Sequence, residues 1–340
     1  MVPLIHSGLL APFVTRAAAE GEWCLDELLK SGLPPSLASG EPLIVPLSSA
    51  LDFVHKSAKR LQAPELGLEV GALASVRSLP HFDGLLARSM TLRNAISIVA
   101  LSLPKLTNVR RIWLNNGSRM AQLCQATPRF SCAGSEYAEQ FALMLLINLV
   151  REVGGRNWSP KEVTVSPSTF ELIGRHPELL RNSKVNVGDC TSFAFDSAML
   201  DRPLQVNRKA HSLLVLPRNR SQEVPLDLIG SITACLESNV RAGHVGLRFL
   251  SVQMGVSART VQRELAVLGL TYDQLLGRAR LRIAHELLKD RKLLIEEIAF
   301  ELGYQDAANF TRAFKRWTGL APREYRTALI SPNNDRDHGP

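Results

Sequence analysis

Residues 250–265 read Leu250-Ser-Val-Gln-Met-Gly-Val-Ser-Ala-Arg-Thr-Val-Gln-Arg-Glu-Leu265, and residues 298–317 read Ile298-Ala-Phe-Glu-Leu-Gly-Tyr-Gln-Asp-Ala-Ala-Asn-Phe-Thr-Arg-Ala-Phe-Lys-Arg-Trp317. Each pattern has an apolar helical segment, a glycine, and a polar capping residue before a second helical segment. A glycine at such a corner allows the backbone to turn sharply with little strain. The two glycines, Gly255 and Gly303, lie 48 positions apart. The sequence therefore predicts two helix-turn-helix units in tandem, a pattern typical of proteins that read adjacent turns of DNA.

The first unit has an apolar face and a polar face on its second helix. Ser257 is a suitable N-cap for that helix. The residues expected to point inward are Val261, Leu265 and Leu268. The residues expected to point outward are Arg259, Thr260, Gln262 and Arg263. Arginine can bond both acceptors of guanine, and glutamine the donor and acceptor of adenine, when such a helix lies in the major groove. Taken alone, the same face is also compatible with an ordinary solvated helix.

The second unit repeats the turn and adds an aromatic core. Asp306 is the expected cap, and an aromatic stripe at helical spacing, Phe310, Phe314 and Trp317, is expected to face inward as packing rather than as a platform for bases. The polar residues left for the groove or the phosphates are Asn309, Thr311, Arg312 and Lys315. Between the units, residues 272–289 predict one helix of about 26 Å at 1.5 Å per residue. Such a rod can hold two recognition helices roughly one DNA turn, about 34 Å, apart.

Residues 227–326 resemble the DNA-binding domain of the AraC/XylS family of bacterial transcription regulators. The resemblance is strongest in residues 298–304 and 310–319 and in Ala321-Pro-Arg-Glu-Tyr-Arg326. It implies base-reading positions at Arg259, Gln262 and Arg263 in the first unit and at Ala308, Asn309 and Arg312 in the second. It also implies activation through contacts with RNA polymerase. The sequence departs from the family pattern at Phe249, Ser251, Val252 and Glu264, and the alanines 307 and 308 leave the second helix short of hydrogen-bonding groups. We therefore expect the second unit to hold phosphates and read shape more than bases.

Composition and charge agree with a DNA-binding protein that has two domains. The chain has 340 residues and a formal net charge of +8. Residues 241–330 hold fifteen Lys/Arg and nine Asp/Glu, so about a quarter of the chain carries most of the net positive charge. Such an excess suits a polyanionic partner.

The cysteines indicate a reducing compartment, and the apolar segments bear on secretion and membrane insertion. Five scattered cysteines without a CxxC pair indicate free thiols in a cytoplasmic protein. The N-terminus lacks the basic start of a secretory signal. The apolar run 141–150 is about half the length that a bilayer requires, so we expect no membrane partner.

The region before residue 205 predicts an α+β domain, because helical and strand patterns alternate along it. The expected helices cover residues 25–30, 47–61, 91–103, 135–153 and 177–181. The expected strands cover residues 109–114, 120–125, 162–165 and 192–195. The resulting fold class is an α+β sensor domain followed by an all-α DNA-binding domain, whose two helix-turn-helix units, 248–269 and 295–318, are joined by a long helix.

The N-terminal region also resembles the arabinose-binding-type sensor domain of one AraC-family branch. Four segments carry the resemblance, namely residues 66–71, 85–103, 156–163 and 195–204. It implies an effector-binding and self-associating domain over residues 20–205, hence a small-molecule effector and a homodimer, without making arabinose the effector. A linker over residues 206–226, with its proline-rich part at 216–225, a DNA-binding domain over 227–328 and a flexible tail over 329–340 complete the expected organisation. Five polar or aromatic residues lie inside or beside apolar segments, and each is more in keeping with packing or a surface position than with a ligand contact: His55, His81, Trp113, Tyr137 and Arg156.

Together these patterns predict a cytoplasmic transcription regulator that binds double-stranded promoter DNA and responds to an effector as an activator. We expect no enzyme, no cofactor, no metal and no catalytic residue, because the chain lacks clustered thiolates, a nucleophile elbow, a phosphate loop and an HExxH helix. The alternative is a DNA-binding domain fused to an enzymatic or purely protein-interaction module. A purely architectural or protein-interaction module, in which the helix-turn-helix pairs act as packing units, predicts weak binding that hardly distinguishes one DNA sequence from another.

Overall fold

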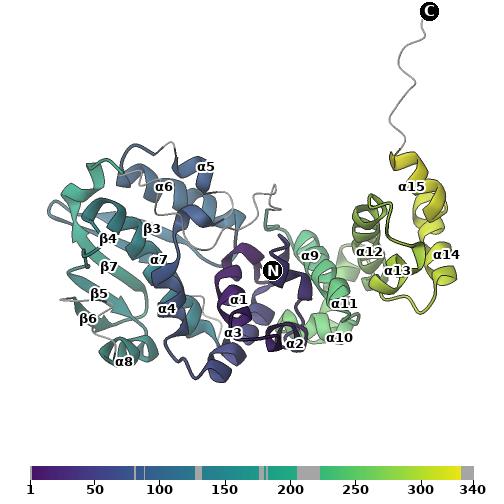
Figure 1. Ribbon diagram of the computed structural model, residues 1–340, viewed down its shortest axis with the longest axis horizontal. Helices are drawn as coiled ribbons and strands as arrows, with labels where there is room; N and C mark the ends of the chain where they lie inside the picture. The colour runs from purple at the N-terminus through teal and green to yellow at the C-terminus, as the bar shows by residue number, and fades with distance from the viewer. Residues whose placement is uncertain are drawn as a thin grey trace, which may run out of the picture. The chain divides into compact units, whose positions relative to one another are not determined.

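The computed structural model describes residues 2–79, 82–87, 89–126, 132–175, 180, 183–204 and 223–330. The described chain divides into two compact units, one from Pro3 to Leu226 and one from Asp227 onward. Figure 1 shows the first unit with both strands and helices and the second with helices alone. The expected order, an α+β domain followed by an all-α domain, is confirmed.

The first unit is built on a five-stranded sheet in the order β3-β4-β7-β5-β6. All neighbouring strands are antiparallel except β5 and β6, which are parallel. The strands of this sheet are β3 (Ile112–Asn116), β4 (Met120–Gln125), β5 (Glu162–Val165), β6 (Lys184–Val187) and β7 (Thr191–Asp196). A separate antiparallel pair joins β1 (Leu4–His6) to β2 (Ile44–Pro46). Both strands of this pair are buried, so residues 3–19 belong to the same unit.

Eight α-helices and five short 3-10 helices surround these strands in the described part of the unit. The α-helices are α1 (Ala11–Ala18), α2 (Trp23–Lys30), α3 (Leu47–Leu61), α4 (Leu66–Leu73), α5 (Asp83–Leu86), α6 (Leu92–Ser102), α7 (Ser135–Gly154) and α8 (Pro167–Arg175). The 3-10 helices are η1 (Ser7–Leu9), η2 (Pro35–Ser39), η3 (Val76–Ser78), η4 (Leu103–Lys105) and η5 (Ser197–Asp201).

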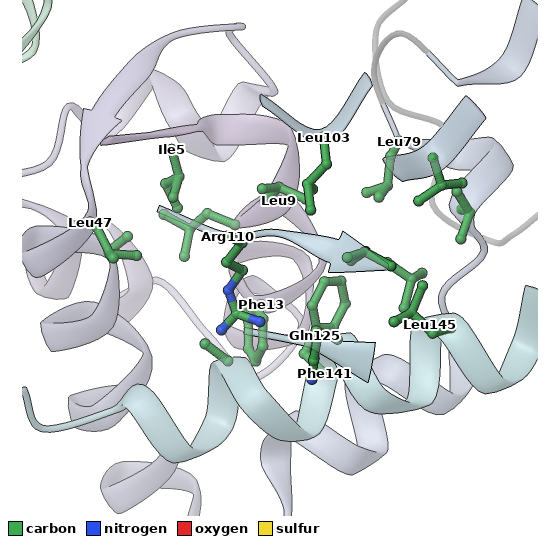
Figure 2. A pocket seen from close by; sticks show the side chains of 18 of the residues that line it. Ile5, Leu9, Phe13, Leu47, Leu79, Leu103, Arg110, Gln125, Phe141 and Leu145 are labelled. Atoms are coloured by element: carbon green, nitrogen blue, oxygen red, sulfur yellow. The ribbon is translucent and has the colours of Figure 1, made fainter. Parts of the chain in front are cut away.

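A cavity of about 90 Å³ lies inside this unit, between α1, α3, α6, α7 and the start of β3. Figure 2 shows its lining, which is almost entirely apolar. Since one water molecule needs about 10–15 Å³ on the same measure, the space exceeds that of a few solvent molecules.

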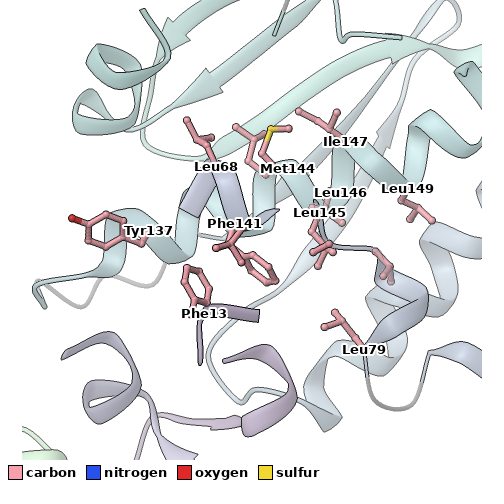
Figure 3. Close-up of a cluster of buried hydrophobic side chains, with 14 of the residues drawn as sticks. Phe13, Leu68, Leu79, Tyr137, Phe141, Met144, Leu145, Leu146, Ile147 and Leu149 are labelled. Atoms are coloured by element: carbon pink, nitrogen blue, oxygen red, sulfur yellow. The ribbon is translucent and has the colours of Figure 1, made fainter. Parts of the chain in front are cut away.

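The core of the unit forms around α7, which is buried along most of its length. Phe141 on α7 and Phe13 on α1 meet with ring centroids 5.2 Å apart, and Figure 3 shows the apolar side chains of α7 gathered beside them. Helix α4 crosses α7 very closely, because Gly67 and Gly71 face it. A Cβ added at Gly67 would lie 2.3 Å from the carbonyl oxygen of Tyr137. Although α7 is long and largely apolar, none of the described helices has the length and hydropathy needed to cross a bilayer.

The second unit contains seven helices within residues 227–330. They are α9 (Leu228–Arg241), α10 (Leu247–Gln253), α11 (Ala258–Val267), α12 (Tyr272–Leu288), α13 (Ile295–Glu301), α14 (Ala307–Thr318) and α15 (Pro322–Ile330). The two expected helix-turn-helix units are α10–α11 and α13–α14, and α12 is the expected long helix between them.

Several expectations differ from the structure in detail. Leu268 was expected to be buried, but it is 46% exposed because α11 ends at Val267 and Leu268 is its C-cap. The sequence pattern did not indicate β1, β2, α8 or β6. The expected helix at 177–181 falls mainly on residues outside the described set, as do His81, most of the linker over residues 206–226 and the tail residues from 331.

Candidate nucleic-acid interface

The two helix-turn-helix units share the same turn. Gly255 and Gly303 have φ angles of +67° and +75°, in the left-handed region that favours glycine. In the first unit, Gly255 N–H donates to the Val252 carbonyl at 3.0 Å and Val256 N–H to the Ser251 carbonyl at 3.1 Å. The second unit has the same two bonds, from Gly303 to Phe300 and from Tyr304 to Ala299, both at 2.9 Å. This pair of bonds defines the Schellman motif, which ends the first helix of each unit and directs the chain into the second.

Helix α11 follows a neutral cap. The Ser257 hydroxyl accepts from the Thr260 amide at 3.1 Å, and the first turn of the helix contains no acidic residue. Val261 and Leu265 are buried and fix the rotation of the helix. The amide end of α11 therefore keeps its partial positive charge, which favours an anion such as a DNA phosphate.

The opposite face of α11 is open to solvent. Arg259, Gln262 and Arg263 are exposed, and Thr260 is half-buried. Within the described residues, the side chains of Arg259 and Gln262 make no hydrogen bond or ion pair. Arg263 contacts only its neighbour Glu264, with 3.1 Å between Nη2 and Oε1. A guanidinium and a primary amide are thus both available for bidentate bonds to base edges.

Helix α14 has the firmer core. Phe310 and Phe314 are completely buried, with ring centroids 5.5 Å apart, and Phe314 also meets Tyr325 of α15 edge-to-face at 5.2 Å. Trp317, the third member of the expected stripe, is half-buried. Its indole lies beside Gly277 of α12, where an added Cβ would be 3.3 Å from Nε1. The aromatic stripe is therefore packing, as the spacing predicted.

The outward face of α14 is occupied by its own hydrogen bonds. The Asp306 carboxylate caps the helix by accepting from the Asn309 amide at 2.6 Å, and its other oxygen accepts from the Asn309 side chain. Arg312 Nη2 donates to Asn309 Oδ1 at 2.6 Å. The Thr311 hydroxyl donates to the Ala307 carbonyl at 2.7 Å, and Ala308 is exposed without any side-chain hydrogen-bonding group. Lys315 is exposed in the last turn.

The chain Asp306–Asn309–Arg312 was not foreseen from the sequence, although the spacing of three residues carries its signal. Residues three apart on a helix lie on the same face, and an acidic cap, an amide and a guanidinium in that order can bond in series. The Asp306 carboxylate also places a negative charge at the end of α14 that would otherwise attract phosphate.

Helix α12 holds the second helix-turn-helix unit through Arg280. Its Nε donates to the Leu302 carbonyl at 3.0 Å, at the end of α13, and its guanidinium carbon lies 4.5 Å from the centre of the Tyr304 ring. Burial raises the pKa of Tyr304, while the positive charge of Arg280 partly opposes that shift. The turn of the second unit is therefore held on α12 by a charged side chain that the sequence pattern did not single out.

Helix α9 holds the first helix-turn-helix unit through a buried pair of amides. Asn239 Nδ2 donates to Gln253 Oε1 at 2.8 Å, and Gln253 Nε2 donates to Asn239 Oδ1 at 3.0 Å. On its other side, α9 packs on α12, where Arg282 and Glu237 form an ion pair at 2.9 Å. The compact unit that begins at Asp227 is thus continuous from α9 to α15, and α11 and α14 present different surfaces.

Two family models match the chain. The helix-turn-helix domain model covers residues 250–328. The model described as the arabinose-binding domain of AraC transcription regulators covers residues 26–204, more than half of the chain. The two matches fall in the second and the first unit, respectively.

Three proteins that are similar to this chain are bacterial transcription regulators. The Ornithine utilization regulator of Pseudomonas aeruginosa is 43% identical over 76 residues, which is 22% of each chain. The HTH-type transcriptional regulator VirS of Mycobacterium tuberculosis is 21% identical over 313 residues, covering 88% of this chain and 89% of VirS. The HTH-type transcriptional activator RhaS of Escherichia fergusonii is 30% identical over 149 residues, covering 44% of this chain and 51% of RhaS. The chain belongs to the AraC family of transcription regulators that carry an N-terminal domain of the arabinose-binding type.

Proposed function

We propose that this chain is a sequence-specific, effector-responsive activator that binds double-stranded promoter DNA through two unequal helix-turn-helix units. The observation that carries the proposal is the exposed face of α11, where Arg259 and Gln262 have no side-chain partner among the described residues. Both side chains suit base edges in the major groove. Helix α14, with Arg312 and Lys315 on a face without free amides, contributes phosphate contacts and orientation.

Family membership supports the wider function that we propose. An activator of this kind contacts RNA polymerase, acts in the bacterial cytoplasm where the chromosome lies, and associates as a homodimer through its N-terminal unit. One relative, RhaS, bears the name of an activator, which supports activation here. We expect no enzymatic step in this function.

The structure of the first unit suggests how an effector signal leaves it. The 3-10 helix η4 contributes Leu103 to the wall of the cavity and ends at Lys105. The Lys105 carbonyl accepts from the Val224 amide at 2.9 Å, and its ammonium group pairs with Glu223 at 2.8 Å. Because Val224 is buried and only two residues separate it from the helix cap Asp227, a shift of η4 moves the point where the chain leaves this unit.

Selection of preferred sites from randomised duplex DNA, followed by affinity measurements on the selected and a scrambled duplex, tests the DNA-binding part. The double variant Arg259→Ala/Gln262→Ala should lose most of the preference for the selected duplex and little affinity for the scrambled one. Arg175→Ala, an exposed arginine of the first unit, is the control for the change in charge. An intact preference in the double variant contradicts the assignment. A wild-type protein with no preference favours the alternative of a purely architectural or protein-interaction module, in which the helix-turn-helix pairs act as packing units.

A promoter reporter tests the signal route. Val224→Ala together with Lys105→Ala should narrow the difference in expression between inducing and non-inducing growth, while the affinity of the purified protein for its site stays within twofold. Val187→Ala with Lys59→Ala, both on exposed positions, is the matched control. An unchanged response in the first pair of substitutions would exclude this route.

A further inference from the structure

The cavity of the first unit has an unusual lining for a sugar site. All its lining side chains are apolar except Arg110, just before β3, and Gln125, at the end of β4. Gln125 pairs in the sheet with Ile112, which follows Arg110 by two residues, so the two polar side chains come from adjacent segments of the chain. In Figure 2, Arg110 extends among apolar side chains with its guanidinium directed toward Phe13. The cavity therefore combines one cationic end with long apolar walls.

Arg110 has no hydrogen bond or ion pair within the part of the chain that the structure describes. Burial lowers its pKa to about 10, and the nearby Glu139 carboxylate partly opposes that shift. The guanidinium therefore remains charged at neutral pH. By exposed area Arg110 is half-buried, and a charge held against apolar walls without a hydrogen-bond acceptor among the described residues is unfavourable, so this residue reduces the stability of the empty domain.

Glu139 is the acidic group closest to serving as that partner, but its oxygens are already occupied. They accept from the Ser166 amide at 3.0 Å, from Thr169 Oγ1 at 2.8 Å and from Thr191 Oγ1 at 2.5 Å. The Ser166 hydroxyl also donates to this carboxylate. Glu139 is thus held by uncharged donors on the α7 side of the sheet, and the donors of Arg110 are left for the cavity.

The chemistry of the lining excludes most polar ligands. A sugar carries a hydroxyl group on nearly every carbon, and each hydroxyl buried without a partner is unfavourable. Two polar side chains cannot satisfy such a ligand. A cationic amine would meet the like charge of Arg110. A single carboxylate on an apolar body matches both parts of the site, because a guanidinium binds a carboxylate through two parallel hydrogen bonds and the apolar walls take the remainder.

We propose that this cavity is the effector site and that its ligand class is an apolar monocarboxylate, such as a medium-chain fatty acid, with the carboxylate on Arg110 and Gln125 and the chain along α1 and α7. The identity of the effector class rests on the proposed function, namely that the first unit senses a small molecule. Binding would reach η4 through Leu103, which lines the same cavity.

Titration of the purified full-length chain with hexanoate, octanoate and decanoate tests the proposal, with octanol, octanamide and octylamine as matched probes. Each probe is followed by calorimetry and by the shift in melting temperature. The carboxylate should bind roughly 10- to 100-fold more tightly than the alcohol or the amide, the range expected when a charge-assisted bond replaces a neutral one. The amine should not bind measurably. Equal binding of octanoate and octanol overturns the assignment of Arg110, and binding of simple sugars in preference to all of these overturns the ligand class.

Two variants test separately the proposed carboxylate contact at Arg110 and the apolar lining of the cavity. Arg110→Leu should abolish the preference for octanoate over octanol, and it should raise the melting temperature of the unliganded protein because an unpaired charge is removed. A structural arginine would do the opposite, and a lower melting temperature therefore contradicts the proposal. Ala142→Leu keeps Arg110 but fills the space beside α7, so it should reduce decanoate binding more than hexanoate binding. Equal effects on both chain lengths contradict the placement of the tail.

DNA binding distinguishes failure of this inference from failure of the proposed function. If carboxylates do not bind but the chain still selects a DNA site and activates a reporter, the ligand class is wrong and the proposed function stands. If octanoate binds through Arg110 but leaves DNA affinity and reporter output unchanged, the ligand site stands and the effector response is wrong.

Discussion

The two recognition helices, α11 and α14, sit behind identical turns but present opposite surfaces. Helix α11 has a thin aliphatic core, a neutral cap and two polar side chains, Arg259 and Gln262, that bond to no described residue. Helix α14 has an aromatic core and an acidic cap, and its Asn309 and Arg312 side chains bond to each other. The Schellman turn fixes where a second helix begins, but it does not decide what that helix can read. A tandem repeat of a fold is therefore not a repeat of a function, and the side-chain bonds of each unit must be considered separately.

The largest expected effect concerns the aromatic core of the second helix-turn-helix unit. Phe314→Ala should reduce the free energy of unfolding of this unit by about 3–5 kcal/mol, because it removes a buried ring from between Phe310 and Tyr325. Scanning calorimetry of the full chain measures the change. Phe300→Ala, at a side chain that is 55% exposed, should change stability by less than about 0.5 kcal/mol. Similar losses in the two variants would show that the aromatic core does not hold the unit together.

A smaller effect on DNA affinity should distinguish contacts to base edges from contacts to phosphates. Arg259→Ala should weaken binding to the preferred duplex by about 1–3 kcal/mol and to a scrambled duplex much less, because a base contact distinguishes sequences. The same comparison applies to Arg263→Ala. Arg312→Ala should weaken both duplexes about equally, because its guanidinium is bonded to Asn309 and is left to phosphates. If Arg312→Ala alters sequence preference as much as Arg259→Ala, the two helices are equal readers and the contrast between them is wrong.

A reciprocal exchange of caps sharpens the comparison further. Asp306→Ser keeps a capping oxygen and removes a negative charge from the start of α14, so affinity for any duplex should rise by about 0.3–1 kcal/mol at low salt. Ser257→Asp should lower it by a similar amount at the start of α11. Fluorescence anisotropy at two salt concentrations measures both. A variant whose affinity does not change has its helix start away from any phosphate, and a rise in affinity for Ser257→Asp contradicts the comparison.

The smallest effect lies in the salt dependence. Lys315→Ala should reduce the slope of log affinity against log salt by about 1, the contribution of one neutralised phosphate. Gln262→Ala carries no charge change and should leave that slope unaltered. A titration of binding between low and moderate salt detects the difference, and an unchanged slope in Lys315→Ala places this lysine away from the backbone of the DNA.

The local patterns that predicted the second unit were sufficient because they act over short distances. Three local signals are read directly from residues 250–318. They are a glycine at a left-handed turn, a capping residue two or three positions later, and apolar residues spaced three and four positions apart. The aromatic stripe of α14 and the start of α12 followed from the same rules. Leu268 was wrongly placed in the core, because a pattern does not show that α11 ends one residue earlier.

The residues that sequence reasoning missed depend on contacts between distant segments. Arg110 stands in the chain beside Arg111 and resembles any surface arginine, and only the folding of α1, α3 and α7 around it creates the cavity. Of the residues singled out in the first unit, Trp113 is 40% exposed, His55 is half-buried, Arg156 is exposed, Tyr137 is buried, and none lines the cavity. The short strands β1 and β2 were missed for the same reason, since three-residue strands carry almost no periodicity.

The reciprocal amides of Asn239 and Gln253 define the smallest piece of this protein that can be transplanted. The helix-turn-helix match begins at residue 250, but a fragment cut there would lose Asn239 and with it both amide–amide hydrogen bonds of Gln253, a side chain that is only 6% exposed in the intact chain. Helix α9 must therefore accompany α10, and a chimera with another sensor should be joined before Asp227. For anyone exchanging sensors among regulators of this family, the useful junction is set by a pair of amides rather than by the edge of the recognisable motif.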